Sequence, residues 1–113
     1  MATRQGTIDF ILEQIEGAGA VSARKMFGEY ALYLGEKTVA LVCDGQLFVK
    51  PTAAGREFIG EVVEGYAFTG AKASFLITGD RWEDRDWLKR LIQITAEELP
   101  EPKKRAAKKK AAL

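Results

Sequence analysis

The chain has 113 residues, of which 47% are hydrophobic and 29% charged, and its formal net charge is +1. This size and composition fit one globular domain with its own core. No apolar run reaches the ~20 residues that cross a membrane, there is no secretory h-region, and a single cysteine fits a reducing compartment, so we expect a cytoplasmic protein.

The sequence contains no histidine and one cysteine, Cys43. Histidine is the usual proton-transfer group near neutral pH and the commonest zinc ligand. Cys/His metal sites and nucleophile–histidine pairs are therefore excluded. We predict a protein that is not an enzyme and has no cofactor.

The first predicted element is a helix, because Ile8, Ile11, Leu12 and Ile15 repeat at helical spacing. It ends at the glycines of residues 17–19. After these glycines, apolar residues recur at every second position.

Residues 21–34 and 38–50 alternate as strands do. Gly28 interrupts the first of these segments, and we interpret it as a bulge or a corner between two strands. Asp44 and Gly45 are typical of a type I′ hairpin turn.

Both faces of these strands are largely apolar. One face of the first segment carries Tyr30, Leu32 and Leu34 and the other Ala31 and Tyr33, while Val39, Leu41 and Cys43 are expected opposite Ala40 and Val42. An antiparallel sheet normally leaves one face in water. We therefore expect helices or a second subunit to cover each face, which predicts a homodimer.

Thr52 is expected to cap a short helix over 53–60, and 74–78 to form a further strand. The last helix carries Trp87 and Leu88 on its apolar face and ends before Pro100. The fold class is thus α+β, with one antiparallel sheet of about four to five strands packed against N-terminal and C-terminal helices. Residues 1–100 form the domain, and 101–113 a disordered basic tail.

Two further groups of residues have a structural and a functional interpretation. The acidic cluster of Asp80, Glu83, Asp84 and Asp86 can hold Mg²⁺ or Ca²⁺ through its oxygens. Acids at the start of a helix are favoured by capping and by the dipole alone, and we prefer that interpretation. Cys43 is interpreted as a small buried hydrophobic residue.

Charge is divided unevenly along the chain. Residues 1–102 contain 11 basic and 16 acidic side chains, a charge of −5, whereas the remaining eleven residues carry +6. These cations can contact nucleic acid weakly and without sequence preference, although Lys/Ala tails also serve as solubilising ends. The candidate contact residues are Lys103, Lys104, Arg105, Lys108, Lys109 and Lys110.

The stretch from Arg24 through 26–28 (Met-Phe-Gly) to the strand that Tyr30 begins resembles the core of the TfoX N-terminal domain, the module of TfoX/Sxy-type bacterial competence regulators. A polar turn and a Leu-aromatic-aliphatic-Lys strand follow in the same order. The motif residues are Arg24, Met26, Phe27, Gly28, Tyr30, Leu47 and Lys50.

The resemblance implies a regulatory domain that contacts a transcription factor or RNA polymerase, and it extends over about residues 7–99. The alternative is a domain that binds a small molecule or an anion. Its pocket would be lined by Arg24, Tyr30, Lys50 and Lys72.

Overall fold

The computed structural model describes residues 4–26, 29–67 and 70–100. In chain order the elements are α1 (Gln5–Ile15), the 3-10 helix η1 (Glu16–Ala18), β1 (Val21–Met26), β2 (Glu29–Leu34), β3 (Lys37–Cys43), β4 (Gln46–Val49), α2 (Ala53–Ile59), β5 (Glu64–Gly65), β6 (Ser74–Ile77), α3 (Gly79–Trp82) and α4 (Arg85–Glu98).

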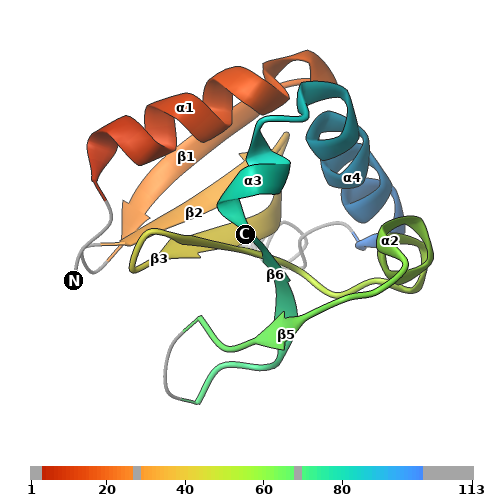
Figure 1. The fold of residues 1–113 in the computed structure, drawn as a ribbon. Coiled ribbons are helices and arrows are strands. Elements are labelled where there is room, and N and C mark those ends of the chain that lie inside the picture. Colours follow the sequence, from red (N-terminus) through yellow and green to blue (C-terminus); the bar gives the residue numbers. More distant parts are fainter. Residues whose placement is uncertain (1–3, 27–28, 68–69, 101–113) are drawn as a thin grey trace, which may run out of the picture.

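The strands form one sheet in the order β1-β2-β3-β4-β6-β5, and every neighbouring pair is antiparallel. The helices lie on one side of this sheet (Figure 1). The α+β class is confirmed. There are six strands rather than four or five, because the two-residue strand β5 gives too short a pattern to be read from the sequence.

The predicted hairpin turn between β3 and β4 is confirmed. Asp44 and Gly45 have φ angles of 53° and 73°, as the two central residues of a type I′ turn require. The expected interruption in 21–34 falls between β1 and β2, and Phe27 and Gly28 themselves lie outside the described residues.

The core lies between the sheet and the helices. Register places Tyr30 beside Val42 and Leu32 beside Ala40, and both rows continue through β4 to β6. The buried residues of this cluster are Ile8, Ile11, Ile15, Tyr30, Leu32, Val39, Ala40, Val42, Leu47, Val49, Phe75, Ile77, Leu88, Leu91, Ile92 and Ala96. The predicted apolar stripe of α1 is thus confirmed, with Leu12 partly buried.

One predicted side-chain direction is wrong. Val39 was expected on the same face as Leu41, but it belongs to the core together with Ala40. The pairing of β2 with β3 shifts between Leu32 and Tyr33. Such a bulge places an extra residue in one strand, so the simple alternation fails there.

Helix α2 begins as predicted. The Thr52 hydroxyl accepts a hydrogen bond from the Gly55 N–H over 2.9 Å. The Glu98 carboxylate, at the end of α4, accepts the N–H groups of Ala53 and Ala54 over 2.9 and 3.0 Å. These bonds satisfy N–H groups that the first helical turn leaves without helical partners and fix α2 against α4.

The sheet face opposite the helices has no described helix over it. Ala31, Cys43 and Phe48 are buried there but belong to no part of the core cluster. Leu41 and Leu76 are partly exposed on the same face. We call this surface the open face. Cover by helices on both faces, one of the two expectations, is therefore not found in the described part of the chain.

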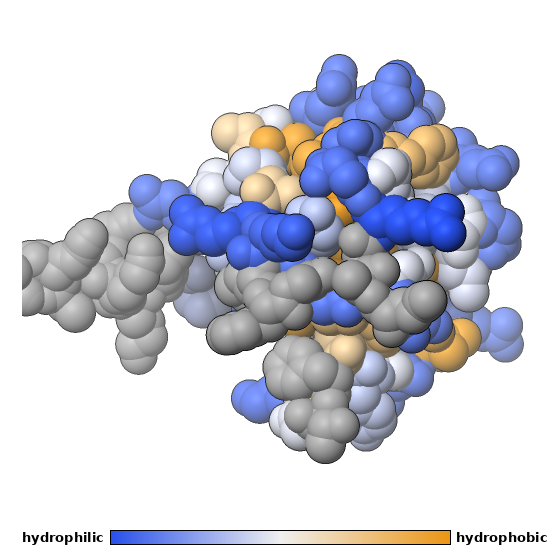
Figure 2. Space-filling view, turned by 90° about the vertical axis from the view of Figure 1, so that its left-hand side faces the viewer, coloured by the Kyte–Doolittle hydropathy of each residue, from blue (hydrophilic) through white to orange (hydrophobic). Residues whose placement is uncertain are grey.

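Within the described ranges, none of the helices is long and apolar enough to span a membrane. On the side of the molecule shown in Figure 2, hydrophobic areas are interspersed among hydrophilic side chains.

Candidate functional site

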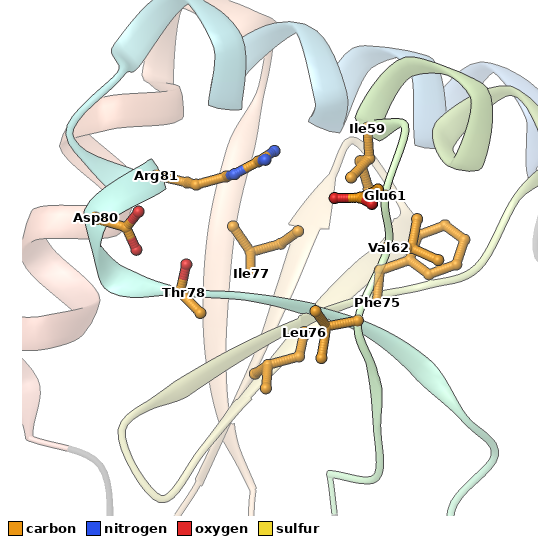
Figure 3. A pocket seen from close by; sticks show the side chains of 10 residues that line it. Ile59, Glu61, Val62, Phe75, Leu76, Ile77, Thr78, Asp80 and Arg81 are labelled. Carbon is orange, nitrogen blue, oxygen red and sulfur yellow. The ribbon is translucent and has the colours of Figure 1, made fainter.

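A cleft of about 550 Å³ lies beside the outer edge of β6, between the segment that follows α2 and the short helix α3 (Figure 3). We call it the edge cleft. It is lined by Ile59, Glu61, Val62, Val63, Phe75, Leu76, Ile77, Thr78, Asp80 and Arg81.

The edge cleft exists because β5 is short. β5 pairs with β6 only at Phe75 and Ser74, and one further hydrogen bond joins the Leu76 N–H to the Val63 carbonyl over 2.7 Å. Beyond Leu76 only Ile77 remains in β6; it pairs with Leu47 of β4, and its carbonyl oxygen accepts the Trp82 Nε1–H.

The walls of the edge cleft are held by contacts with two tryptophans. The Trp82 Nε1–H donates to the Ile77 carbonyl oxygen over 2.9 Å, which ties α3 to the end of β6. Trp87 of α4 stacks on Phe58 of α2, with ring centroids 5.7 Å apart. The guanidinium of Arg81 lies over the Trp87 ring, 4.6 Å from its centroid.

Arg81 lies between two cavities. The second, of about 310 Å³, is lined by Ile59, Asp80, Arg81, Asp84 and Trp87, so the two share three residues. Arg81 is partly buried and forms no ion pair within the described part of the chain. Its N–H groups are therefore candidates to bind an acceptor on a ligand.

Asp80 and Glu61 give the edge cleft negative charge as well. Hydrogen bonds from the Thr78 hydroxyl and from its own backbone N–H lower the pKa of Asp80. The carboxylate therefore stays ionised at neutral pH. An apolar floor with charges of both signs at the rim suits a segment of polypeptide, or a small molecule that carries an anionic group.

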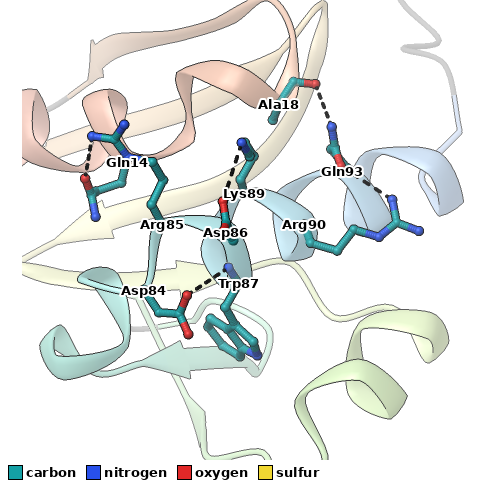
Figure 4. A network of polar contacts seen from close by, with 9 residues as sticks. All are labelled: Gln14, Ala18, Asp84, Arg85, Asp86, Trp87, Lys89, Arg90 and Gln93. Carbon is teal, nitrogen blue, oxygen red and sulfur yellow. Dashed lines mark hydrogen bonds and ion pairs between the residues drawn. The ribbon is translucent and has the colours of Figure 1, made fainter.

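Asp84 and Asp86 of the predicted acidic cluster start α4, as the structural interpretation expected, whereas Asp80 lies in the first turn of α3. The Asp84 carboxylate accepts the Trp87 N–H over 3.2 Å and caps the helix, and Asp86 lies 3.8 Å from the Lys89 ammonium (Figure 4). Within residues 4–26, 29–67 and 70–100, no three His, Cys, Asp or Glu side chains are grouped to hold a metal ion.

A polar network continues from this helix start to α1 and η1. Arg85 donates to Gln14 Oε1 over 3.4 Å, and Gln93 donates to the Ala18 carbonyl over 3.3 Å (Figure 4). These contacts join α4 to the N-terminal elements. Arg85 and Gln93 of α4 therefore have a structural role in these contacts.

The family-motif residues have different surroundings. Tyr30 is buried beneath α1, where its hydroxyl donates to Gln5 Oε1 over 3.0 Å, and Leu47 is in the core. Arg24 is exposed, with its guanidinium 5.6 Å from the centroid of the Tyr33 ring. The side chain of Met26 and the residues Phe27 and Gly28 are outside what the structure describes.

The four residues proposed for an anion pocket do not line one pocket. Tyr30 belongs to the core face, whereas Arg24 pairs with Ala31 and lies on the open face. Lys50 and Lys72 are exposed. Alternating residues of one strand lie on opposite faces of a sheet, so no pocket on one face can contain both Arg24 and Tyr30.

Cys43 is buried, and its pKa is raised by burial and then by the nearby charges of Glu29 and Asp44. This agrees with its interpretation as a small hydrophobic residue. The candidate nucleic-acid contacts from Lys103 to Lys110 all lie outside the described residues.

Sequence reasoning missed Arg81 and Trp87 as neighbours in a site. They lie on different helices, and no local spacing relates either one to Ile59 or Val62. The edge cleft forms only when β5 ends after two residues. No sequence motif predicts where β5 ends.

Comparison with known proteins gives two similarities. The family model described as "TfoX N-terminal domain" matches residues 13–99. A protein of Spirochaeta aurantia, named "Uncharacterized 12.7 kDa protein in trpE 5'region", is 40% identical over 110 residues, which cover 97% of this chain and 95% of that protein.

Proposed function

Because the chain belongs to the TfoX N-terminal domain family, we propose that it is a regulatory interaction domain in transcription. It acts in the cytoplasm without catalysis, through contact with a transcription factor or RNA polymerase. The partner contributes a short segment that lies in the edge cleft.

The observation that supports this proposal is the edge cleft itself. Val62 and Ile77 line its floor and can contact apolar side chains of a partner. A partner segment that lies in the edge cleft places apolar side chains against this floor. The charges of Arg81 and Asp80 at the rim of the edge cleft orient the bound segment of the partner.

A photocrosslinking amino acid tests this contact in cells of the native host. We expect p-benzoylphenylalanine at Val62 to crosslink to an identified transcription factor or RNA polymerase subunit. The matched control is the same substitution at Phe10, which is 39% exposed on α1 and lies outside the edge cleft. Equal, background labelling from both positions would contradict the proposal.

A small anionic ligand is the second candidate function. It is supported by the Arg81 guanidinium, which has no ion-pair partner in the described ranges, and by a cleft volume of about 550 Å³, within the range usual for ligand sites. A thermal-shift screen with nucleotides and small carboxylates tests it. Stabilisation that disappears in Arg81→Gln would support this candidate, and no shift with any of them would contradict it.

The basic tail adds non-specific attraction to DNA in this proposal. Six cations in its last eleven residues can replace counterions on phosphates, which makes such binding steeply dependent on salt. This contribution is independent of the edge cleft.

A further inference from the structure

Strand β1 forms one border of the sheet, and among the described strands only β2 pairs with it. Its outer side is accessible, because the side chains of Ser22, Arg24 and Lys25 are exposed. We call this outer side the β1 edge. The strand order places it at the opposite end of the sheet from β5 and β6, and β6 borders the edge cleft. The β1 edge is therefore a separate surface.

The hydrogen bonds between β1 and β2 determine which backbone groups reach the β1 edge. The Gly35 N–H donates to the Ala20 carbonyl oxygen over 2.8 Å, and the register of the two strands begins with the next pair, Val21 and Leu34. In an antiparallel pair, opposite residues that exchange hydrogen bonds alternate with opposite residues that do not. Every second residue after Ala20 is therefore hydrogen-bonded to β2.

Ala23 and Lys25 lie at the alternate positions, so their N–H and carbonyl groups are directed away from β2. The Val21 N–H, at the first of these positions, donates to the Gly19 carbonyl over 2.9 Å instead of to β2. Within the described part of the chain, no other backbone group bonds to those of Ala23 or Lys25. The β1 edge thus has the unpaired donors and acceptors to which a further strand can bind.

The exposed charges of the β1 edge are positive. Arg24 and Lys25 are exposed, and neither forms an ion pair with a described residue. Arg4 is exposed at the same end of β1, since the side chain of the neighbouring Gln5 accepts the hydroxyl of Tyr30, the residue opposite Lys25.

Two acidic residues at this end of the sheet have contacts elsewhere. Glu29 begins β2, and its carboxylate accepts the Asp44 N–H over 3.1 Å at the β3–β4 turn, away from β1. Asp9 of α1 accepts a hydrogen bond from Gln5 Nε2 over 2.9 Å. Positive charge therefore prevails along this part of the β1 edge.

These positive charges select the class of strand that can pair with the β1 edge. Exposed charged side chains protect an edge strand from pairing with uncharged strands. Opposite charges on directly facing residues stabilise an antiparallel pair, whereas like charges destabilise it. A strand with two consecutive acidic residues that face Lys25 and Arg24 therefore pairs favourably, and a strand with lysines at these positions is repelled.

Ala23 favours an apolar residue at the next position of such a strand. Ala23 is opposite Leu32 of the core, and its side chain is partly buried against the core together with that of Val21. Helix α1 packs against β1 on this side of the sheet (Figure 1). An apolar side chain that faces Ala23 therefore extends the core beneath α1.

We propose that the β1 edge binds an extended acidic segment of a partner protein as a further antiparallel strand. Two consecutive acidic residues of the segment face Lys25 and Arg24, and the apolar residue that follows them faces Ala23. Main-chain hydrogen bonds form with Ala23 and Lys25. In strand addition of this kind the main-chain bonds give affinity, and the side chains give specificity.

The backbone of the β1 edge matches a polypeptide better than a nucleic acid. Phosphates offer acceptors to the cations and to the N–H groups, but they have no donor for the carbonyl groups of Ala23 and Lys25. An extended polypeptide has a donor and an acceptor at each residue, directed alternately to either side. It can therefore satisfy both kinds of group.

Fluorescence anisotropy of the full chain with a labelled peptide tests the proposal. The probe is the acetylated peptide TVEEVTV, whose two glutamates are designed to face Lys25 and Arg24 and whose next valine faces Ala23. We expect saturable binding in about 150 mM salt, where distant charges are screened. The peptide TVKKVTV should bind at least about tenfold more weakly.

The double variant Arg24→Glu with Lys25→Glu reverses the charge of the β1 edge. It should bind TVEEVTV at least about tenfold more weakly than the unchanged chain does and should prefer TVKKVTV. The matched control, Lys50→Glu with Lys72→Glu, changes the net charge equally at exposed positions outside β1 and should bind as the unchanged chain does. Circular dichroism verifies that both variants are folded.

N-methylation of the peptide distinguishes strand addition from attraction between charges alone, including attraction to the basic tail. The N–H of the first glutamate, which faces Lys25, is directed at the β1 edge, whereas that of the second glutamate is directed away from it. A methyl group on the first nitrogen should weaken binding about tenfold, and one on the second should have little effect.

No binding of TVEEVTV up to about 1 mM would overturn the proposal, as would equal effects of the two methyl groups or equal losses in the two charge variants. Tighter binding of VSARKM, a peptide with the sequence of β1, would assign the β1 edge to a second copy and also overturn it. Crosslinking from Val62 is measured separately, so either proposal can fail while the other stands.

Discussion

The guanidinium of Arg81 lies 4.6 Å from the centroid of the Trp87 ring. Phe58 stacks on the same indole at 5.7 Å, so side chains from α2, α3 and α4 meet at one residue. The walls of the edge cleft therefore depend on Trp87 for their relative position.

We predict an energetic coupling between Arg81 and Trp87. Urea unfolding of Arg81→Ala, Trp87→Leu and the double variant should give a coupling free energy of about 0.5–1 kcal/mol, the usual size of a cation–π contact at a partly exposed site. Arg90→Ala with Trp87→Leu is the matched control and should be additive. Additivity for the Arg81 pair would show that the contact contributes no stability.

Stability should depend on pH through Glu98. Hydrogen bonds from Ala54 and Ala53 lower its pKa below the ordinary 4.5. Because the pKa of Glu98 is lower in the folded protein than the ordinary value, the stabilisation is fully present above pH 4.5. It is lost as the pH falls through the pKa of the folded state. The melting temperature of the unchanged chain should exceed that of Glu98→Gln at about pH 7, and the difference should shrink in acid.

Glu97→Gln is the control for this pH series, because it removes the neighbouring carboxylate and leaves the hydrogen bonds to α2 in place. A melting-temperature difference for Glu98→Gln that stays constant down to about pH 3 would contradict the role given to Glu98.

The cap of α2 should contribute measurably to stability. Thr52 is 7% exposed and its hydroxyl accepts the Gly55 N–H. Thr52→Ala should lower the free energy of unfolding by about 1–2 kcal/mol, the usual cost of losing an N-cap. Thr52→Ser retains the hydroxyl and should recover most of that loss, as measured by urea unfolding. Equal loss in both variants would assign the effect to the lost methyl group instead.

The Cys43 thiol should react slowly in the folded protein. Burial, Glu29 and Asp44 all raise its pKa, so less thiolate is present at about pH 8 than for a free cysteine. Labelling with a disulfide reagent should proceed at least about tenfold faster in urea than in buffer. Equal rates under the two conditions would show that the thiol is accessible and normally acidic.

Non-specific DNA binding should require the tail. Deletion of 103–113 should abolish binding to duplex DNA of unrelated sequences, and the affinity of the full chain should fall steeply between about 50 and 200 mM salt. Fluorescence anisotropy measures both. Binding that survives the deletion with the same salt slope would assign it to another surface.

Much of the fold could be predicted because it depends on local pattern. Ile8, Ile11 and Ile15 place one face of α1 in the core, and the Asp44–Gly45 pair determines a hairpin. The residue types of the family motif were sufficient to identify the family, which the match over residues 13–99 confirms.

The sequence by itself thus determined the class, the N-terminal caps of α2 and α4 and the two-sided apolar strands. Only the tertiary structure decided that the described helices lie on one face, that the bulge turns Val39 inward, and that Arg81 meets Trp87 beside the edge cleft. The physical reason is the distance along the chain over which each feature is determined. Caps, turns and periodicity depend on neighbours along the chain, whereas a cleft or an uncovered face depends on which distant segments pack together.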